Sequence, residues 1–231
     1  MDSKNDVYII DSYGLIYRSY FAFITRPLVN SQNENISAVF GFFRNLINII
    51  KSHNPKYIIA AFDSRIPTFR HEKYPEYKAT RDKTPEDLHA QIPVIEDLLS
   101  TLGVTVLRKD GFEADDIIAT IAEKCEKSNM GCKILSGDKD LMQLVTESTT
   151  MMCPDKAGGW QDIGIEEVEE KWGVKPELML DLLSLIGDTA DNVPGVKGIG
   201  EKTAAKLLKE YGSLDGIYQQ ADSIKGAMGE K

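Results

Sequence analysis

Three acidic residues, Glu113, Asp115 and Asp116, stand together just before an apolar run. The spacing of that run predicts an amphipathic helix beginning here. A helix N-terminus stabilises one acidic side chain by about 0.3–1 kcal/mol. Two carboxylates about 5 Å apart repel each other by roughly 3 kcal/mol at an effective dielectric constant near 20. On these residues alone, an acidic turn facing water and a cation site are equally good interpretations.

Further acidic residues stand where predicted strands end. Asp11, Asp63 and Asp138 each follow an apolar run that indicates a buried strand. Carboxyl ends of parallel strands meet at one edge of a sheet, so these side chains are expected to converge. Capping of the following helices would explain one or two of these acids. It would not explain six on one edge, counting Glu113, Asp115 and Asp116 as well. The full candidate set is Asp11, Asp63, Glu113, Asp115, Asp116, Asp138, Asp140, Asp188 and Asp191.

The candidate set offers only oxygen ligands, which favours a hard cation such as Mg²⁺ or Mn²⁺. The three histidines show no zinc-ligand spacing. So many carboxylates can hold two ions about 4 Å apart, the arrangement used in phosphoryl chemistry. Asp188 and Asp191 would share one face if their segment were helical.

A basic segment runs from Arg65 to Lys83 and carries a net charge of +3 in an otherwise acidic protein. Its cations alternate with aromatic side chains, a combination that suits a single nucleic-acid strand. A solvated loop with an amphipathic edge explains the composition at least as well.

A third candidate is the glycine-rich stretch from Gly195 to Lys206, which leads into a predicted helix. Such a turn presents backbone N–H groups to an anion, and nearby lysines reinforce phosphate binding. A contact with the DNA backbone in a helix-hairpin-helix is the better interpretation, and a plain interhelical turn is the alternative. The Gly-Lys-Ser/Thr ending of a Walker loop is absent.

The elements that must position these residues alternate along the chain. Apolar runs predict strands at 7–10, 57–62, 104–107 and 133–136, with a further candidate at 149–153. Helices are predicted at about 15–23, 36–51, 84–102 (capped by Thr84), from 111 onward, and at 176–186, 201–211 and 213–220. This alternation predicts an open, mostly parallel sheet with helices on both faces. After about Val174 the pattern changes to helices without strands, which indicates a subdomain boundary.

The composition is that of a globular protein of 231 residues with a formal net charge of −9. Leaving the nine candidate carboxylates aside, the remainder is formally neutral, so the acidity does not exclude a nucleic-acid partner. No apolar run is long enough to span a bilayer, and the N-terminus is too polar for a signal peptide. Three cysteines without metal or redox spacing suit a reducing cytosol.

Taken together, these motifs resemble the 5′ nuclease family, which includes flap endonucleases and the 5′–3′ exonuclease domains of bacterial DNA polymerase I. The segments that carry the resemblance are Ile10-Asp11, Ala61-Phe62-Asp63 through Arg81, Gly111–Asp116, Ser136–Asp140 and Gly187–Ala204. The resemblance implies a PIN-like α/β core over 1–174 with a helical arch at about 64–92. It also implies a helix-hairpin-helix subdomain over 175–231, truncated at its C-terminus.

The resemblance also implies roles for individual residues. Asp11, Asp63, Glu113, Asp115 and Asp138 would hold one Mg²⁺ ion. A second ion would be held or supported by Asp138, Asp140, Asp188 and Asp191. Asp116 would mainly support these ligands and would not bind the ion directly. Mn²⁺ would substitute, and K⁺ would bind at the glycine-rich turn. The expected catalytic residues are Asp11, Asp63, Lys78, Arg81, Asp115 and Asp138. The expected DNA contacts are Tyr17, Arg18, Arg70, Lys78, Arg81, Lys197, Gly198, Gly200, Lys202 and Thr203.

The expected function is hydrolysis of DNA phosphodiesters at a free 5′ end, at flaps, nicks or RNA–DNA junctions, in replication and repair. We expect a bacterial, cytoplasmic, nucleoid-associated protein without membrane contact, fused to a C-terminal polymerase domain. One alternative is a catalytically weak, nuclease-like DNA scaffold. Another, a receiver or phosphatase-like domain, is disfavoured because Asp11-Ser12-Tyr13 lacks the Asp-x-Asp that a haloacid-type phosphatase needs.

Overall fold

Five predicted apolar runs and one further strand form a single sheet. The computed structural model describes residues 5–155, 158–221 and 224. The strand order is β3-β2-β1-β4-β5-β6; β1 to β5 are parallel, and β6 runs antiparallel to β5. The strands are β1 Val7–Asp11, β2 Tyr57–Phe62, β3 Thr105–Arg108, β4 Cys132–Leu135, β5 Thr149–Pro154 and β6 Trp160–Ile163. The prediction of a mostly parallel sheet is confirmed.

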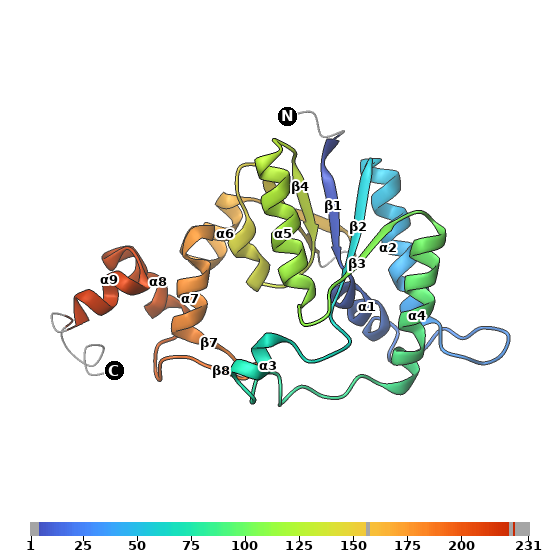
Figure 1. Ribbon diagram of the computed structural model, residues 1–231, viewed down its shortest axis with the longest axis horizontal. Coiled ribbons are helices and arrows are strands. Elements are labelled where there is room, and N and C mark those ends of the chain that lie inside the picture. Colours follow the sequence, from blue (N-terminus) through green and yellow to red (C-terminus); the bar gives the residue numbers. More distant parts are fainter. Residues whose placement is uncertain (1–4, 156–157, 222–223, 225–231) are drawn as a thin grey trace.

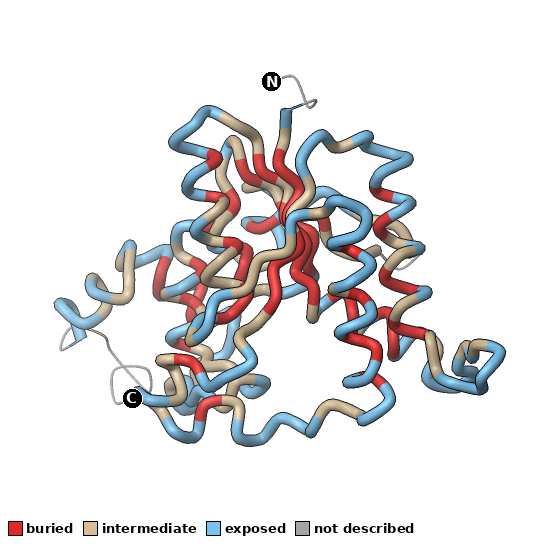
Figure 2. Tube along the Cα trace, turned by 45° about the vertical axis from the view of Figure 1, so that its right-hand side comes forward, coloured by how far each residue is buried: buried red, intermediate tan, exposed pale blue. Residues whose placement is uncertain are grey.

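Helices cover both faces of this sheet (Figure 1). Side chains alternate along β1, so that Tyr8 and Ile10 pack on one face whereas Val7 and Ile9 pack on the other. The first face carries α1 Ser12–Phe21, α2 Ser37–His53 and α4 Glu86–Thr101. The second carries α5 Ala114–Lys127, α6 Ile165–Trp172, α7 Met179–Ile186 and α8 Glu201–Tyr211. Buried segments are concentrated in the strands between these two layers (Figure 2).

The part of the chain after Val174 is helical but not free of strands. The helices η3 Pro176–Leu178 and α9 Leu214–Gln219 accompany α7 and α8. Between α7 and α8, β7 Gly187–Asp188 pairs with β8 Val193–Pro194 in a two-stranded ribbon. The expectation that the C-terminal part lacks strands is therefore wrong, and the condition under which Asp188 and Asp191 would share a helix face is not met. The reason is local, because Asp188 Oδ1 accepts hydrogen bonds from the amides of Ala190 and Asp191 and closes a turn.

The C-terminal helices pack into the same core as the sheet. Val174, Leu182 and Leu208 belong to one buried cluster with Ile118 of α5 and Ile9 of β1. Apolar packing is therefore continuous across the predicted boundary near residue 174. The expected truncation of the C-terminal part lies outside the described residues.

Residues 64–85, here called the strap, connect β2 to α4 and pass the edge of the sheet at which the parallel strands end (Figure 1). The predicted arch is helical only at α3 Phe69–Lys73 and again from Glu86; residues 74–85 are turns and irregular backbone. Pro85 is the N-cap of α4, and Thr84 does not cap it as predicted. The Thr84 hydroxyl is instead hydrogen-bonded to the Tyr17 hydroxyl of α1.

Besides the β7–β8 ribbon, the elements missed from the sequence are β6, α6 and the short η2 Asp140–Leu144. Within the described part of the chain, no helix is both long enough and apolar enough to cross a membrane.

Candidate metal and nucleic-acid site

Asp11 lies at the carboxyl end of β1, the position predicted from the sequence, and is 8% exposed. Its carboxylate accepts hydrogen bonds from Gly14 N at 3.0 Å and from Ser136 Oγ at 2.7 Å. A Cβ at Gly14 would lie 2.4 Å from Asp11 Oδ2, so only glycine leaves room for this carboxylate. Gly14 and Ser136 thus orient Asp11, a role that strand-end reasoning did not reveal.

The end of β2 is joined to the start of α5 through Asp63. Its Oδ1 accepts a hydrogen bond from Ala114 N at 2.7 Å. Glu113 is the N-cap of α5, and its own amide donates to Asp116 Oδ2 at 2.9 Å. The acidic cluster therefore begins α5 as predicted, but part of it is used to cap the helix.

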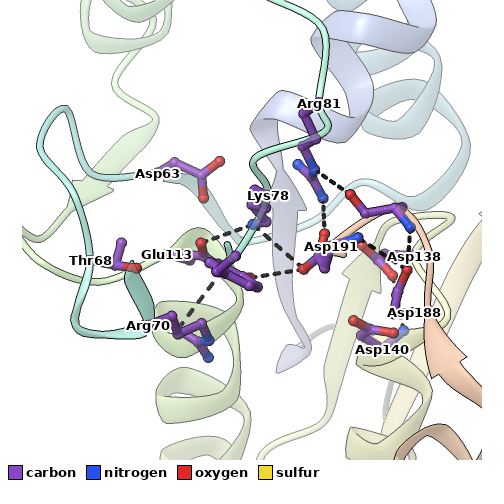
Figure 3. A network of polar contacts seen from close by, with 12 residues as sticks. Asp63, Thr68, Arg70, Lys78, Arg81, Glu113, Asp138, Asp140, Asp188 and Asp191 are labelled. Atoms are coloured by element: carbon purple, nitrogen blue, oxygen red, sulfur yellow. Dashed lines mark hydrogen bonds and ion pairs between the residues drawn. The ribbon is translucent and has the colours of Figure 1, made fainter. Parts of the chain in front are cut away.

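Four of the nine candidate carboxylates are hydrogen-bonded to cations of the protein. Lys78 Nζ lies 2.8 Å from Glu113 Oε1 and 3.8 Å from Asp191 Oδ2, between the two in Figure 3. The other pairs are Arg70 with Asp116, two hydrogen bonds of 2.8 and 2.9 Å; Arg81 with Asp191; and Lys139 with Asp188 at 2.6 Å. Three of these cations come from the strap, which therefore neutralises part of the acidic edge.

Four other carboxylates, Asp11, Asp63, Asp115 and Asp138, have no cation within ion-pair distance among the residues the structure describes. Burial, with the nearby charges of Asp11, Asp138 and Asp63, raises the pKa of Asp115 to about 8. Burial also raises the pKa of Asp11, even though Ser136 and Gly14 hydrogen-bond to its carboxylate. These shifts reflect burial first, and then the negative charge of neighbouring acids that the protein leaves uncompensated.

Asp140 belongs to the same region, at the start of η2. Burial and then the neighbouring Asp138 raise the pKa of its carboxyl to about 6. Its Oδ1 is buried without a hydrogen-bond partner, and Lys139 Nζ stands 3.8 Å away. This orphaned oxygen and the oxygen-only donor set fit a hard cation.

The side chains do not form a finished metal cage. Among the described residues, no group of three or more His, Cys, Asp or Glu side chains has an arrangement that could hold an ion. The physical reason is visible in the ion pairs, because Glu113, Asp188 and Asp191 each point to a cation instead of a shared centre. An ion with Glu113, Asp188 or Asp191 among its ligands would have to replace those protein cations.

The strap is fastened to the β7–β8 ribbon near this site. Lys78 N donates to Asp191 O at 3.0 Å, and Asn192 Nδ2 donates to Glu76 O at 2.8 Å. The hydroxyl of Tyr77, a residue 8% exposed, donates to Glu113 Oε2 and Asp191 Oδ2 at 2.9 and 2.8 Å. The sequence identified Tyr77 only as an aromatic among cations; its bridge between two candidate ligands is a tertiary feature.

The glycine-rich turn precedes α8, as predicted, with Gly200 as the N-cap. Lys197, Gly198, Gly200 and Lys202 are exposed, and Thr203 is half-buried. A groove of about 740 Å³ separates this turn from β7 and is lined by Gly187, Asp188, Lys139, Gly200, Lys202 and Thr203. The turn therefore faces the acidic edge across a groove.

The two remaining candidates lie on α1. Tyr17 is half-buried and its ring stacks against Phe21, with centroids 6.2 Å apart. Arg18 is exposed and lines a cavity together with Asp11 and Asp138. Both are therefore close to the end of β1.

A parallel sheet covered on both faces, with acids at its carboxyl edge and a cationic strap, defines a PIN-like α/β nuclease fold. Family models agree: residues 6–173 match the N-terminal resolvase-like domain of 5′-3′ exonucleases, and residues 174–231 match their C-terminal SAM fold. The chain belongs to the 5′-3′ exonuclease family.

Sequence relatives are DNA polymerase I proteins. The chain is 51% identical to DNA polymerase I of Treponema pallidum over 231 residues, all of this chain and 23% of the relative. It is 42% identical to the thermostable DNA polymerase I of Thermus thermophilus over 224 residues, 97% of this chain and 26% of the relative. The chain therefore spans about a quarter of the length of these relatives.

Solved structures share the fold. The T5 D15 protein, co-crystallised with metal ions, matches with a TM-score of 0.77 and 23% identity over 96% of this chain and 81% of that chain. Flap endonuclease-1 from Methanococcus jannaschii matches with a TM-score of 0.62 and 20% identity over 94% of this chain and 75% of that chain.

Proposed function

We propose that this chain is a divalent-metal-dependent 5′ nuclease that hydrolyses phosphodiester bonds of DNA carrying a free 5′ end. The observation that carries the proposal is the set of uncompensated carboxylates, Asp11, Asp63, Asp115 and Asp138, at one edge of the sheet. Like charges so placed are costly unless a cation joins them. Family membership and the T5 D15 protein crystallised with metal ions support the same proposal.

The residues fit two ions by their chemistry. Asp11, Asp63, Glu113, Asp115 and Asp138 would hold one Mg²⁺, and Asp138, Asp140, Asp188 and Asp191 the second, with Mn²⁺ as a substitute. Asp116 would support the site through Arg70 and the Glu113 amide. When bound, two such ions supply an activated water and stabilise the leaving oxygen. Any K⁺ would bind at the glycine-rich turn.

The strap cations would bind the substrate. If Glu113 and Asp191 held a metal ion, Lys78 and Arg81 would lose these partners and would be available to neutralise the phosphate that is cut. A phosphate offers both side chains charge-assisted hydrogen bonds. Arg70 remains paired with Asp116 in this scheme and contributes to positioning.

Duplex DNA would be held away from the acids, at the glycine-rich turn. The start of α8 and Lys202 supply N–H groups and a positive charge to the sugar-phosphate backbone. Tyr17 and Arg18 on α1 would contact the end of the strand near Asp11. The bacterial DNA polymerase I relatives support a polymerase domain as partner on the same chain.

The test is incubation with a 5′-labelled flap duplex, with and without Mg²⁺. Mg²⁺-dependent release of short 5′ fragments, absent on the same duplex with a blocked 5′ end, supports the proposal. Binding of the flap without cleavage in Mg²⁺ or Mn²⁺ would favour the alternative, a nuclease-like DNA scaffold.

A further inference from the structure

A second cavity, of about 610 Å³, lies next to the acidic edge, beyond the ends of β4 and β5. Its lining includes Asp11 and Asp138 together with Arg18 of α1 and Lys171 of α6. Trp160 and Trp172, the only tryptophans of the 231 residues, both line it as well. The volume is within the range of about 300–1,000 Å³ typical of small-molecule sites.

Two of the three cations that line this cavity are available to a ligand, and the third, Lys139, is paired with Asp188. Arg18 and Lys171 are exposed, and neither makes an ion pair with any carboxylate among the described residues. In this they differ from Lys78, Arg70 and Arg81, whose charges are already matched by acids. An anion bound in this cavity could therefore interact with Arg18 and Lys171 without breaking an existing ion pair.

The tryptophans supply a flat apolar surface beside these cations. Trp172 is half-buried; its Nε1 donates to Met142 Sδ at 2.9 Å, which fixes the ring. Lys171 Nζ lies over the ring, 5.4 Å from its centroid. Lys171 is exposed, so the ring face beneath it can accept a nucleobase when that lysine turns to a phosphate.

We propose that this cavity binds a single nucleotide with a terminal phosphate, the phosphate at Arg18 and Lys171 and the base against Trp172. Asp11 and Asp138 repel a phosphate on their side, which directs it toward the two cations. The choice of a nucleotide rests on the proposed function, in which such an end is both substrate and product. The cavity would then hold the 5′-terminal nucleotide beside the candidate metal site.

The two tryptophans make the proposal testable by intrinsic fluorescence in EDTA, where cleavage is absent. Thymidine 5′-monophosphate should quench the emission saturably, and thymidine should bind at least about tenfold more weakly because it lacks the charge. Trp160→Phe, with Trp172 as its single reporter, should keep the quenching, whereas Trp172→Phe should lose most of it.

Charge variants provide the matched control. Arg18→Ala with Lys171→Ala should weaken binding of the monophosphate by about tenfold or more. Lys51→Ala with Lys56→Ala removes the same charge from exposed residues near the amino ends of the strands and should leave binding unchanged. Circular dichroism of each variant confirms that it is folded.

Three results would overturn the inference: no saturable quenching by the monophosphate, equal binding of thymidine, or equal effects of the two double variants. Quenching by inorganic phosphate as strong as by the monophosphate would show an anion site without a base site, and would also refute it. Flap cleavage measured separately with Mg²⁺ distinguishes the two proposals, because either can fail while the other holds.

Discussion

At the scale of single residues, the acidic edge contains two kinds of carboxylate. Glu113, Asp116, Asp188 and Asp191 have cationic partners, whereas Asp11, Asp63, Asp115 and Asp138 have none within ion-pair distance among the described residues. The unpaired group raises the free energy of the metal-free protein, because its charges repel one another at short range. Stability and cleavage should therefore respond in opposite directions to changes in this group.

The substitution Asp138→Asn tests directly whether stability and cleavage change in opposite directions. Above about pH 8, where Asp115 is ionised, removing one charge should raise the Tm in EDTA, because it relieves repulsion from Asp11 and Asp115. The same change should lower the single-turnover cleavage rate about 100-fold or more, the usual effect of losing one preorganised stabilising group. DNA binding should remain measurable. Normal cleavage by the variant in Mg²⁺ would remove Asp138 from the site.

The raised pKa of Asp115 predicts how the stability of the metal-free protein depends on pH. Its pKa rises from an ordinary 3.8 to about 8 in the folded protein, so the native state binds the proton more tightly. Its contribution to the free energy of unfolding is therefore complete below about pH 4 and is lost as the pH rises to about 8. Denaturant unfolding in EDTA should show wild type weakening over this range and Asp115→Asn weakening less. Equal slopes would contradict the shift.

Lys78 and Lys83 allow a matched comparison within the strap. Lys78 is held beside Glu113 and Asp191, whereas Lys83 is exposed and forms no ion pair with any residue that the structure describes. If Lys78 acts on the reacting phosphate, Lys78→Ala should lower the single-turnover rate at saturating protein about 100-fold. Lys83→Ala should change only the binding constant. Equal rates for the two variants would assign Lys78 to binding alone.

At the scale of elements, the β7–β8 ribbon both carries Asp188 and Asp191 and fastens the strap. Its close approach to the end of α7 depends on a glycine. A Cβ at Gly195 would lie 2.2 Å from Ile186 C and 2.4 Å from Gly187 N, distances that backbone atoms cannot accept. Ribbon, strap and acidic edge are thus coupled through one tight backbone contact.

Gly195→Ala should open the ribbon, lower the Tm and make the strap more accessible to protease. Gly200→Ala is the control, because a Cβ there has no atom within 4 Å and its backbone angle is ordinary for any residue. Its cost should stay near 1 kcal/mol or less. Limited proteolysis and thermal unfolding compare the two. A Gly195→Ala variant as stable as Gly200→Ala would show that the ribbon adapts easily.

At the scale of the whole molecule, the question is how a protein with net charge −9 holds a polyanion. Negative charge is concentrated at the edge of the sheet, whereas Lys197, Lys202 and Lys206 stand exposed around the start of α8. Local charge, not the total, decides where phosphates bind.

Lys202→Ala tests that separation. Each neutralised phosphate of B-DNA changes the slope of log K against log salt concentration by about 0.9. The variant should therefore bind duplex and flap DNA more weakly and flatten the slope by about one unit. Its cleavage rate at saturation should hardly change. Fluorescence anisotropy over a salt series measures both, with Lys51→Ala as control. An unchanged slope, or an equal loss on single strands, would make the turn a plain connection.

Much of this protein followed from its sequence alone. Apolar runs of strand length identified the five parallel strands, and parallel strands place their final residues on one edge, so the meeting of Asp11, Asp63 and Asp138 was predictable. The helix that begins at the Glu113 cluster and the turn that leads into α8 followed from local patterns in the same way. Periodicity and strand direction are short-range properties, which a sequence shows directly.

Other features depended on contacts between distant residues. The strap is mostly irregular because it bonds to the β7–β8 ribbon more than 100 residues away: Tyr77 and Arg81 of the strap bond to Asp191, and Asn192 of the ribbon bonds to Glu76 O. Contacts between distant residues also produce the pairing of four acids with cations and the cavity lined by Trp160 and Trp172. Local sequence patterns do not determine which charged side chains form ion pairs, because the pairing depends on how separate elements pack together.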